Sequence, residues 1–147
     1  MKIISTCLLM ISLFITPAKW YSNFNEAKKE AAKTNKLILL NFSGSDWCSP
    51  CIQMKKNIFE SDAFAQFAAE NLVLANADFP RQKKHKLSTE QKKLNETLAA
   101  AYNPDGKFPY TLLLTGGGKV LHKWDGLPEL SAQQFVDVIK QHMDENR

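Results

Sequence analysis

The sequence predicts one α/β domain in which a central mixed β-sheet is flanked by helices. Three observations support this fold class. Short apolar runs alternate with amphipathic helical segments, the turn Gly116-Gly117-Gly118 joins the last two apolar runs, and neither a repeat nor a Pro/Gly-rich linker divides the chain. A length of 147 residues suits a single domain with its own core. We expect strands joined by helices to be parallel and the final pair to be antiparallel.

The first residues have the layout of a secretory signal peptide. Lys2 precedes an apolar run from Ile3 to Ile15, and Thr16-Pro17-Ala18 places small residues before a possible cleavage site. The run is shorter than the about 20 residues of a membrane-spanning helix. We therefore expect residues 1–18 to be removed, and residues 19–147 to form a periplasmic or secreted domain without stable membrane insertion. A short uncleaved anchor is the alternative.

The first half of the exported chain predicts two helix–strand pairs. Asn23 or Asn25 can cap a helix that ends at Lys36, and residues 37–42 form a buried strand interrupted only by Asn41. A helix then begins near Pro50, because proline suits a first helical turn. Ser61 and Asp62 can cap a continuation of this helix, and residues 72–79 form the second strand. The expected inward-facing residues of the first helix and of this continuation are Phe24, Ala27, Ala31, Ala32, Phe64, Phe67 and Ala68.

The second half predicts a helix, a hairpin and a final helix. Capping boxes begin the two helices, at Ser88 with Gln91 and at Ser131 with Gln134. Between them, residues 111–115 and 119–124 form the hairpin strands. The expected inner faces of these helices consist of Leu94, Leu98, Ala101 and Tyr102, and of Phe135, Val138, Ile139, His142 and Met143.

The chemistry of the chain is expected at Cys48 and Cys51. Cys7 leaves with the leader, so the exported domain holds only these two cysteines, spaced Cys-x-x-Cys at a helix start. There, free N–H groups and the helix dipole stabilise a thiolate and lower the pKa of Cys48 below its ordinary value of about 8.5. Cys48 would form a mixed disulfide with a substrate, and the more buried Cys51 would resolve it.

The segment Trp47-Cys48-Ser49-Pro50-Cys51, together with Phe108-Pro109 before the hairpin, resembles the thioredoxin superfamily. The resemblance covers the chain from about Phe24 onward, and residues 41–48 are most similar to exported bacterial thioredoxin-like proteins, including the corresponding domains of thiol:disulfide interchange proteins. It implies a thioredoxin fold for residues 19–147 and a redox-active Cys48–Cys51 disulfide. It also implies a cis peptide bond at Pro109, facing the dithiol and presenting backbone to an extended substrate.

Three departures from thioredoxin stand out. Asn41 occupies the position of a buried aspartate and cannot take the proton of Cys51, so the proton acceptor stays unassigned. Tyr110 follows the proline, where thioredoxin usually has threonine, and is expected to alter the substrate groove. The expected substrate-binding residues are Trp47, Phe108, Pro109 and Tyr110. Between Asp78 and Pro109 lie 30 residues, about twice the usual length, which leaves room for a basic segment and an extra helix.

The expected activity is therefore thiol–disulfide exchange with protein substrates, without any cofactor beyond the dithiol. Ser49 and Pro50 carry no positive charge to support the thiolate, and an exposed Asp46 would oppose it, so the protein is expected to lean toward reduction. It would act as a monomer with a redox partner that keeps it reduced. The formal charge of +4 is too small to indicate nucleic acid.

Other functions are weighed against this one. Structural zinc lacks its four ligands, because the histidines His85, His122 and His142 are scattered. Copper(I) delivery stays open, since two thiolates suffice for a soft ion, and a methionine or histidine aimed at them would favour it; Met54 is nearest in sequence but is expected to pack in the core. A redox-inert binding module is disfavoured by the intact cysteines.

Two further features have two interpretations each. Trp47 is either a substrate platform beside Cys48 or a lid on the core, whereas Trp20, Phe59 and Trp124 are expected to be packing residues. A basic cluster is either a solvated face or a docking surface for acidic partners. Its members, opposed by Glu90 alone, are Arg81, Lys83, Lys84, Lys86, Lys92 and Lys93.

Overall fold

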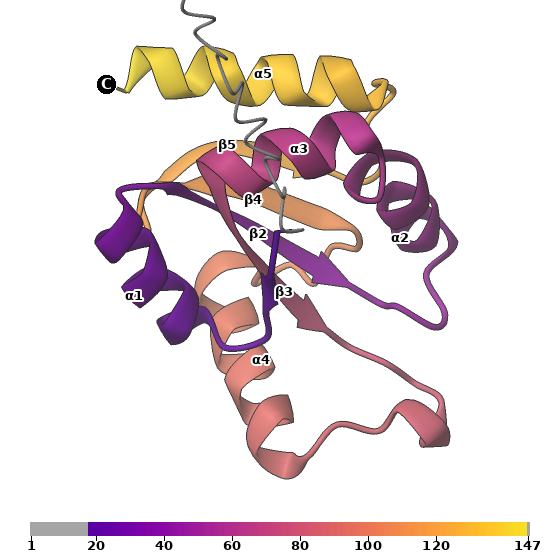
Figure 1. The fold of residues 1–147 in the computed structure, drawn as a ribbon. Helices are drawn as coiled ribbons and strands as arrows, with labels where there is room; N and C mark the ends of the chain where they lie inside the picture. Colours follow the sequence, from indigo (N-terminus) through magenta and orange to yellow (C-terminus); the bar gives the residue numbers. More distant parts are fainter. Residues whose placement is uncertain (1–17, 147) are drawn as a thin grey trace, which may run out of the picture.

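The computed structural model describes residues 18–146, so the expected signal peptide falls, except for Ala18, outside the described residues. A mixed sheet of five strands lies between two layers of helices (Figure 1), with the strand order β1-β3-β2-β4-β5. The strands are β1 Trp20–Tyr21, β2 Leu37–Ser43, β3 Leu72–Asp78, β4 Tyr110–Leu114 and β5 Val120–Asp125. The α-helices are α1 Phe24–Thr34, α2 Ser49–Met54, α3 Asp62–Asn71, α4 Thr89–Tyr102 and α5 Ala132–Glu145. The predicted α/β class, a mixed sheet flanked by helices, is confirmed.

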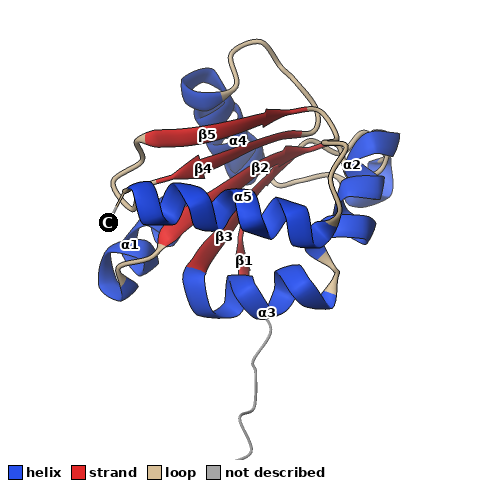
Figure 2. Cartoon of the chain, turned by 90° about the horizontal axis from the view of Figure 1, so that it is seen from above, coloured by secondary structure: helices blue, strands red, loops and turns tan. Residues whose placement is uncertain are grey.

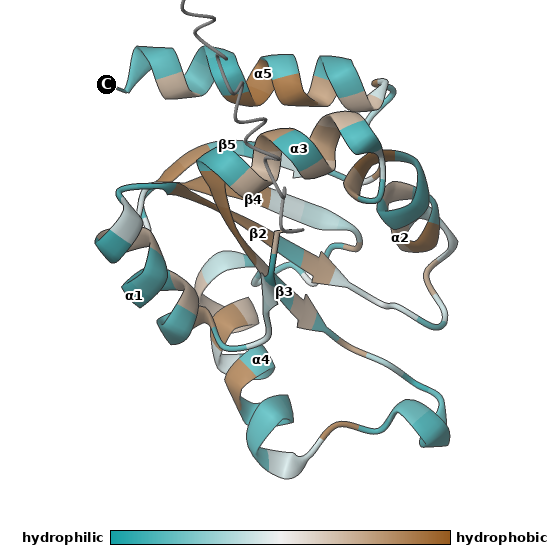
Figure 3. Ribbon diagram, in the orientation of Figure 1, coloured by the Kyte–Doolittle hydropathy of each residue, from teal (hydrophilic) through white to brown (hydrophobic). Residues whose placement is uncertain are grey.

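The two faces of the sheet bury separate halves of the core. Helices α2, α3 and α5 cover one face, where Leu39 and Leu113 meet Phe64 and Phe135. Helices α1 and α4 cover the other face, as Figures 1 and 2 show from two directions. Because β2 is buried on both sides, its sequence is almost continuously apolar. Figure 3 shows the same division, with apolar residues concentrated in the strands and in the helix faces that meet them.

Local sequence signals set most of the helix boundaries. Asn23, Ser61, Ser88 and Ser131 are the N-caps of α1, α3, α4 and α5, and each side chain accepts a backbone N–H. The capping box at Ser131 is complete. At α4 only half of it forms, because the Gln91 amide donates to Ser22 O and Asn95 Oδ1 instead.

The direction of β4 differs from the prediction that helix-joined strands are parallel. Tyr110 pairs with Phe42 and the strand runs antiparallel to β2. Helix α4 carries the chain back to the end of the sheet where β2 begins and β4 ends, and there the Tyr102 hydroxyl donates to Gly118 O at 3.0 Å. Residues 103–109 then return along the sheet before β4 starts. This return places Pro109 at the edge where β2 and β3 end.

Smaller differences concern single residues and short elements. The strand β1 was missed, because its pairing with β3 is non-local and it has two residues. Ala32 and Ala101 are exposed rather than inward-facing, whereas Asn95 and Val136 are buried. Helix α2 continues as a π-helical turn, Lys55–Phe59. The predicted Gly116–Gly118 turn is confirmed, and Gly118 adopts a φ of +95° that a side chain would resist. Among residues 18–146, none of the helices has the length and apolar character needed to cross a bilayer.

Candidate active site

The two cysteines lie where the chain leaves β2 and enters α2. The backbone N–H of Cys48 donates to Gly44 O at 2.9 Å, which closes the turn after the strand. Cys48 is the N-cap of α2, Pro50 is in the first turn, and the Cys51 N–H donates to Cys48 Sγ at 3.3 Å. The two sulfur atoms are joined in a disulfide, with Cα atoms 5.2 Å apart. The expected position of the Cys-x-x-Cys pair at a helix start is therefore observed.

The burial of the two cysteines is nearly equal. Cys48 is 5% exposed and Cys51 is 4% exposed, so the expected contrast between an open first cysteine and a covered second one is not seen. In the disulfide form, Cys48 Sγ lies over the helix start and accepts the Cys51 N–H.

The Trp47 indole is contacted at its N–H group and at its ring. Its Nε1–H donates to Phe79 O at 2.7 Å, and its ring meets the edge of Phe108 with centroids 5.5 Å apart. The guanidinium of Arg81 lies 3.6 Å from the ring centroid. Gly44 lies against the indole and has no Cβ to obstruct it. Trp47 is half-buried, and these contacts hold the indole as a wall beside Cys48.

The loop before β4 supplies the opposite wall. The peptide bond between Phe108 and Pro109 is cis, and Pro109 O accepts the N–H of Gly126 at 2.9 Å. Phe108 reaches Trp47, which places this loop beside the cysteine motif. Tyr110 behaves differently, because it is only 8% exposed and packs near Phe42 in the core.

A polar network lies beneath the motif, in the middle of the sheet. The Asn41 amide donates to Asn76 Oδ1 at 2.9 Å, and the Thr111 hydroxyl lies 3.0 Å from Asn41 Oδ1. A cleft of about 590 Å³ leads to Cys51 between these groups and Asp78. The Asp78 carboxylate accepts both the backbone N–H and the hydroxyl of Ser45. Asn41, at the position of the thioredoxin aspartate, thus belongs to a network in which its side-chain amide has hydrogen-bond partners.

Asp46 has a structural role that its sequence position does not reveal. It was expected to be an exposed carboxylate, but its side chain is 3% exposed. The backbone N–H groups of Arg81 and Gln82 donate to its two oxygens at 2.9 Å each, and His85 Nδ1 lies 3.0 Å away. The Arg81 N–H is the largest influence that lowers the pKa of Asp46 to about 2, followed among the lowering influences by the Gln82 N–H and the His85 ring, whereas burial acts in the opposite direction. No local pattern marks this contact, because the partners are 35 to 39 positions apart.

The copper(I) alternative finds no support around the cysteines. Met54 is fully buried, as expected, and its sulfur is contacted by the Thr111 hydroxyl at 3.6 Å. His85 faces Asp46. His122 and His142 were expected to be scattered, but their rings lie 4.5 Å apart because β5 packs beneath α5. Within the described range, no three His, Cys, Asp or Glu side chains are grouped to hold a metal ion.

Comparison with known proteins agrees with this geometry. The chain is 38% identical over 101 residues to disulfide bond reductase DsbH of Chlamydia pneumoniae, a match that covers 69% of this chain and 59% of that protein. It is 27% identical over 88 residues to the thioredoxin-related protein DsbJ of the same organism, which covers 54% of this chain and 25% of DsbJ. The match thus spans less than two thirds of either relative.

A solved structure described as a DsbH oxidoreductase superposes with a TM-score of 0.78 at 29% identity, over 88% of this chain and 86% of that one. A thioredoxin from Thermus thermophilus shares the fold, with a TM-score of 0.64 at 16% identity over 86% of this chain and 87% of that one. The family model described as thioredoxin-like matches residues 19–112. The chain therefore belongs to the thioredoxin-like family.

Proposed function

We propose that the chain is a thiol–disulfide oxidoreductase that exchanges its Cys48–Cys51 pair with the thiols and disulfides of other proteins. The observation that carries this proposal is the disulfide at the start of α2, next to the cis-proline loop. The edge contact between Trp47 and Phe108 is what brings the two segments together. The name of the relative DsbH, a disulfide bond reductase, supports the same chemistry.

In the reducing direction, the Cys48 thiolate attacks one sulfur of a substrate disulfide. A mixed disulfide forms, the substrate S–S bond breaks, and the other substrate sulfur leaves as a thiolate that takes up a proton. Cys51 then loses its proton and attacks Cys48 Sγ, which releases the second substrate thiolate and restores the internal disulfide. Two electrons pass from the dithiol to the substrate. The Cys51 N–H, which points at Cys48 Sγ, would stabilise the Cys48 thiolate.

The direction proposed for this exchange is reduction of substrates. Ser49 and Pro50 place no positive charge between the cysteines. The Cys51 N–H and the helix dipole make the Cys48 thiolate form more readily than an ordinary one. Without a positive side chain they do not stabilise it enough to make the disulfide a strong oxidant. A redox partner must then return the pair to the dithiol form after each cycle.

The substrate would lie across the surface formed by Trp47 and the cis-proline loop, next to Cys48. Trp47 and Phe108 are half-buried and in contact with each other, so together they offer one aromatic surface next to the cysteine motif. The cis-proline loop would present backbone to an extended substrate, although Pro109 O itself is occupied by the Gly126 N–H. Tyr110 is packed inward near Phe42, so it would support Pro109 from within the core instead of contacting substrate.

The cell compartment is proposed from the N-terminal sequence alone. Residues 1–18 would direct export and be removed, leaving a monomeric periplasmic or secreted domain that starts near Lys19. N-terminal sequencing of protein from the native envelope tests this, and recovery of a chain that starts at Met1 would contradict it.

The activity is tested by following the reduction of an exposed protein disulfide by dithiothreitol. The wild-type chain should accelerate it, and Cys48→Ser should not. Cys51→Ser should accumulate mixed disulfides with substrate on Cys48, because the resolving thiol is absent. Equal trapping by Cys48→Ser and Cys51→Ser, or equal rates for Cys48→Ser and wild type, would overturn the proposal. In a glutathione buffer, oxidation of reduced substrate proteins would instead indicate an oxidase.

A further inference from the structure

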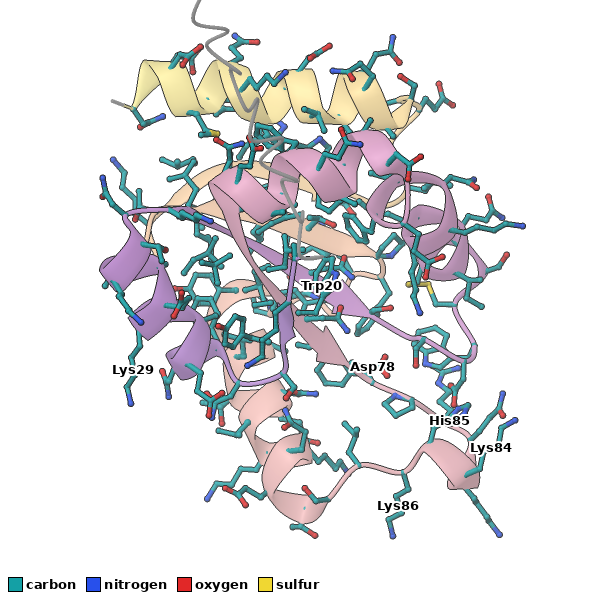
Figure 4. All side chains as sticks on the ribbon, in the orientation of Figure 1. Trp20, Lys29, Asp78, Lys84, His85 and Lys86 are labelled. Atoms are coloured by element: carbon teal, nitrogen blue, oxygen red, sulfur yellow. A yellow bond between two sulfur atoms is a disulfide. The ribbon has the colours of Figure 1, made fainter. Side chains whose placement is uncertain are left out.

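The segment between β3 and α4, residues 79–88, is called the basic loop below. Arg81, Lys83, Lys84 and Lys86 lie on it, and all four are exposed. Among residues 18–146, neither Lys83, Lys84 nor Lys86 has an ion-pair partner, since the described salt bridges involve other residues. Figure 4 shows Lys84 and Lys86 pointing away from the body of the domain. Their positive charge therefore faces solvent without an acidic neighbour to neutralise it.

The basic loop is fixed beside the cysteine motif. Asp46, two positions before Cys48, accepts the N–H groups of Arg81 and Gln82 and contacts His85. Gln82 also donates its side-chain amide to Asp46 O at 3.2 Å. The loop is thus anchored through three residues, Arg81, Gln82 and His85, to the segment that carries the first cysteine. A partner bound to the loop would therefore lie next to the redox-active pair.

The anchoring also removes the nearest acidic side chain from the surface. The Asp46 side chain is 3% exposed and surrounded by N–H donors. Asp78, at the start of the loop, is occupied by Ser45 and by the Phe79 N–H. The exposed charged side chains of the loop itself, Arg81, Lys83, Lys84 and Lys86, are all positive. A fixed cluster of one sign of charge raises the local concentration and the association rate of a ligand of opposite sign.

The surface is also hollowed at this place. A cleft of about 270 Å³ runs between the basic loop and the first turns of α4. Arg81, Lys83, Lys86 and Lys92 border it together with one acidic residue, Asp78, and Phe79 and Leu87 contribute apolar walls. Lys92 is partly neutralised by Glu96 at 3.7 Å. A groove with cations on its rim and apolar side chains in its wall suits a peptide that carries acidic and apolar residues together.

We propose that the basic loop is the docking surface for an acidic segment of the protein whose disulfide or thiols exchange with Cys48. The inference rests on the proposed function, because it identifies the class of its substrate. Docking would be preorganised, since Asp46 already holds the loop in place and little ordering is needed on binding. Arg81 is held on the Trp47 ring, so the main contribution to docking comes from Lys83, Lys84 and Lys86.

The kinetic test compares two disulfide peptides of equal length, one with four glutamates beside the disulfide and one with four glutamines. We expect wild-type protein to reduce the acidic peptide roughly tenfold faster at low ionic strength, an advantage that shrinks as salt is added. The variant K83Q/K84Q/K86Q should lose most of this ratio. The control K29Q/K33Q/K119Q removes three exposed lysines elsewhere and should keep it; Figure 4 shows Lys29 on α1, away from the basic loop.

A binding test separates docking from redox chemistry. The same peptides with serine in place of cysteine are titrated into the oxidised protein, and the dissociation constants are compared. Docking predicts tighter binding of the acidic peptide and a loss of roughly tenfold in K83Q/K84Q/K86Q only, whether or not disulfide exchange is observed. Equal binding of both peptides, equal losses in the control variant, or tighter binding to phosphatidylglycerol vesicles than to the acidic peptide would overturn the inference. Failure of disulfide reduction with docking intact would overturn the proposed function alone.

Discussion

Gly44 lies against the indole ring of Trp47, so closely that a Cβ atom at position 44 would stand 2.3 Å from Cε2 of the tryptophan. Real Cβ atoms do not approach other carbon atoms to this distance. Since Trp47 is also hydrogen-bonded to Phe79 O, the indole cannot move away without breaking that bond. The absence of a side chain at position 44 is therefore a requirement for the wall beside Cys48.

The first prediction follows from this contact. Gly44→Ala should displace the indole, break its bond to Phe79 O and lower the free energy of unfolding by about 1–3 kcal/mol, measured by chemical denaturation. Gly117→Ala is the matched control, because its Cβ would meet only Thr115 Oγ1 at an ordinary 3.8 Å; it should change stability by less than about 0.5 kcal/mol. Equal effects of the two substitutions would mean that Trp47 adapts freely.

The second prediction concerns the amide network beneath the cysteines. Thr111→Val keeps the shape of the side chain but removes the hydroxyl that Asn41 Oδ1 contacts at 3.0 Å. Thr111 is fully buried, so the lost hydrogen bond should lower the free energy of unfolding by about 1–3 kcal/mol. Thr97→Val, at an exposed position of α4, serves as the control in the same denaturation experiment. A Thr111→Val protein as stable as wild type would show that this bond adds nothing to the fold.

The third prediction tests the anchor of the basic loop. Asp46→Asn replaces two accepting oxygens by one, so one of the N–H groups of Arg81 and Gln82 loses its partner. Trypsin should then cut the loop after Arg81, Lys83 and Lys84 several-fold faster at neutral pH. Asp105→Asn changes an exposed aspartate outside the loop and should leave the cleavage rate as in wild type.

The same anchor has a pH dependence of known sign. The pKa of Asp46 is lowered from 3.8 to about 2, first by the Arg81 N–H. A carboxyl group whose pKa is lowered on folding stabilises the folded form at pH values above its ordinary pKa. This stabilisation is lost as pH falls from about 4 toward 2. Hydrogen exchange at the Arg81 and Gln82 amides, corrected for intrinsic rates, should show the loop opening over this range. Asp46→Asn should show no such transition, and a transition that persists in it would assign the effect to another group.

Local signals explain why most helices and the cysteine site were predictable from the sequence. The N-cap serines and the cysteine spacing act within one helical turn, so a short stretch of sequence contains both partners. The apolar run of β2 likewise identifies a strand buried on both faces.

Contacts between distant segments explain what was missed. The strand β1 exists only through its pairing with Leu74 and Ala75, and Asp46 meets the basic loop only once the sheet has formed. The direction of β4 depends on the return of residues 103–109 along the sheet, which no periodicity records. Gln91 forms half of a capping pattern but uses its amide to join Ser22 and Asn95. Each of these depends on a partner from another element.

The last prediction concerns the pair His122 and His142, whose rings lie 4.5 Å apart. Burial against the neighbouring Trp124 ring lowers the pKa of His122 from its ordinary 6.5, and the charge of His142 lowers it further. The unfolded chain then binds a proton at His122 before the folded chain does, so the free energy of unfolding falls as pH drops through about 6.5. His122→Gln should flatten this slope between pH 8 and 5 in denaturation experiments. His142→Gln should flatten it in part, because it removes the second influence on the pKa of His122. An unchanged slope in His122→Gln would place the titrating group elsewhere.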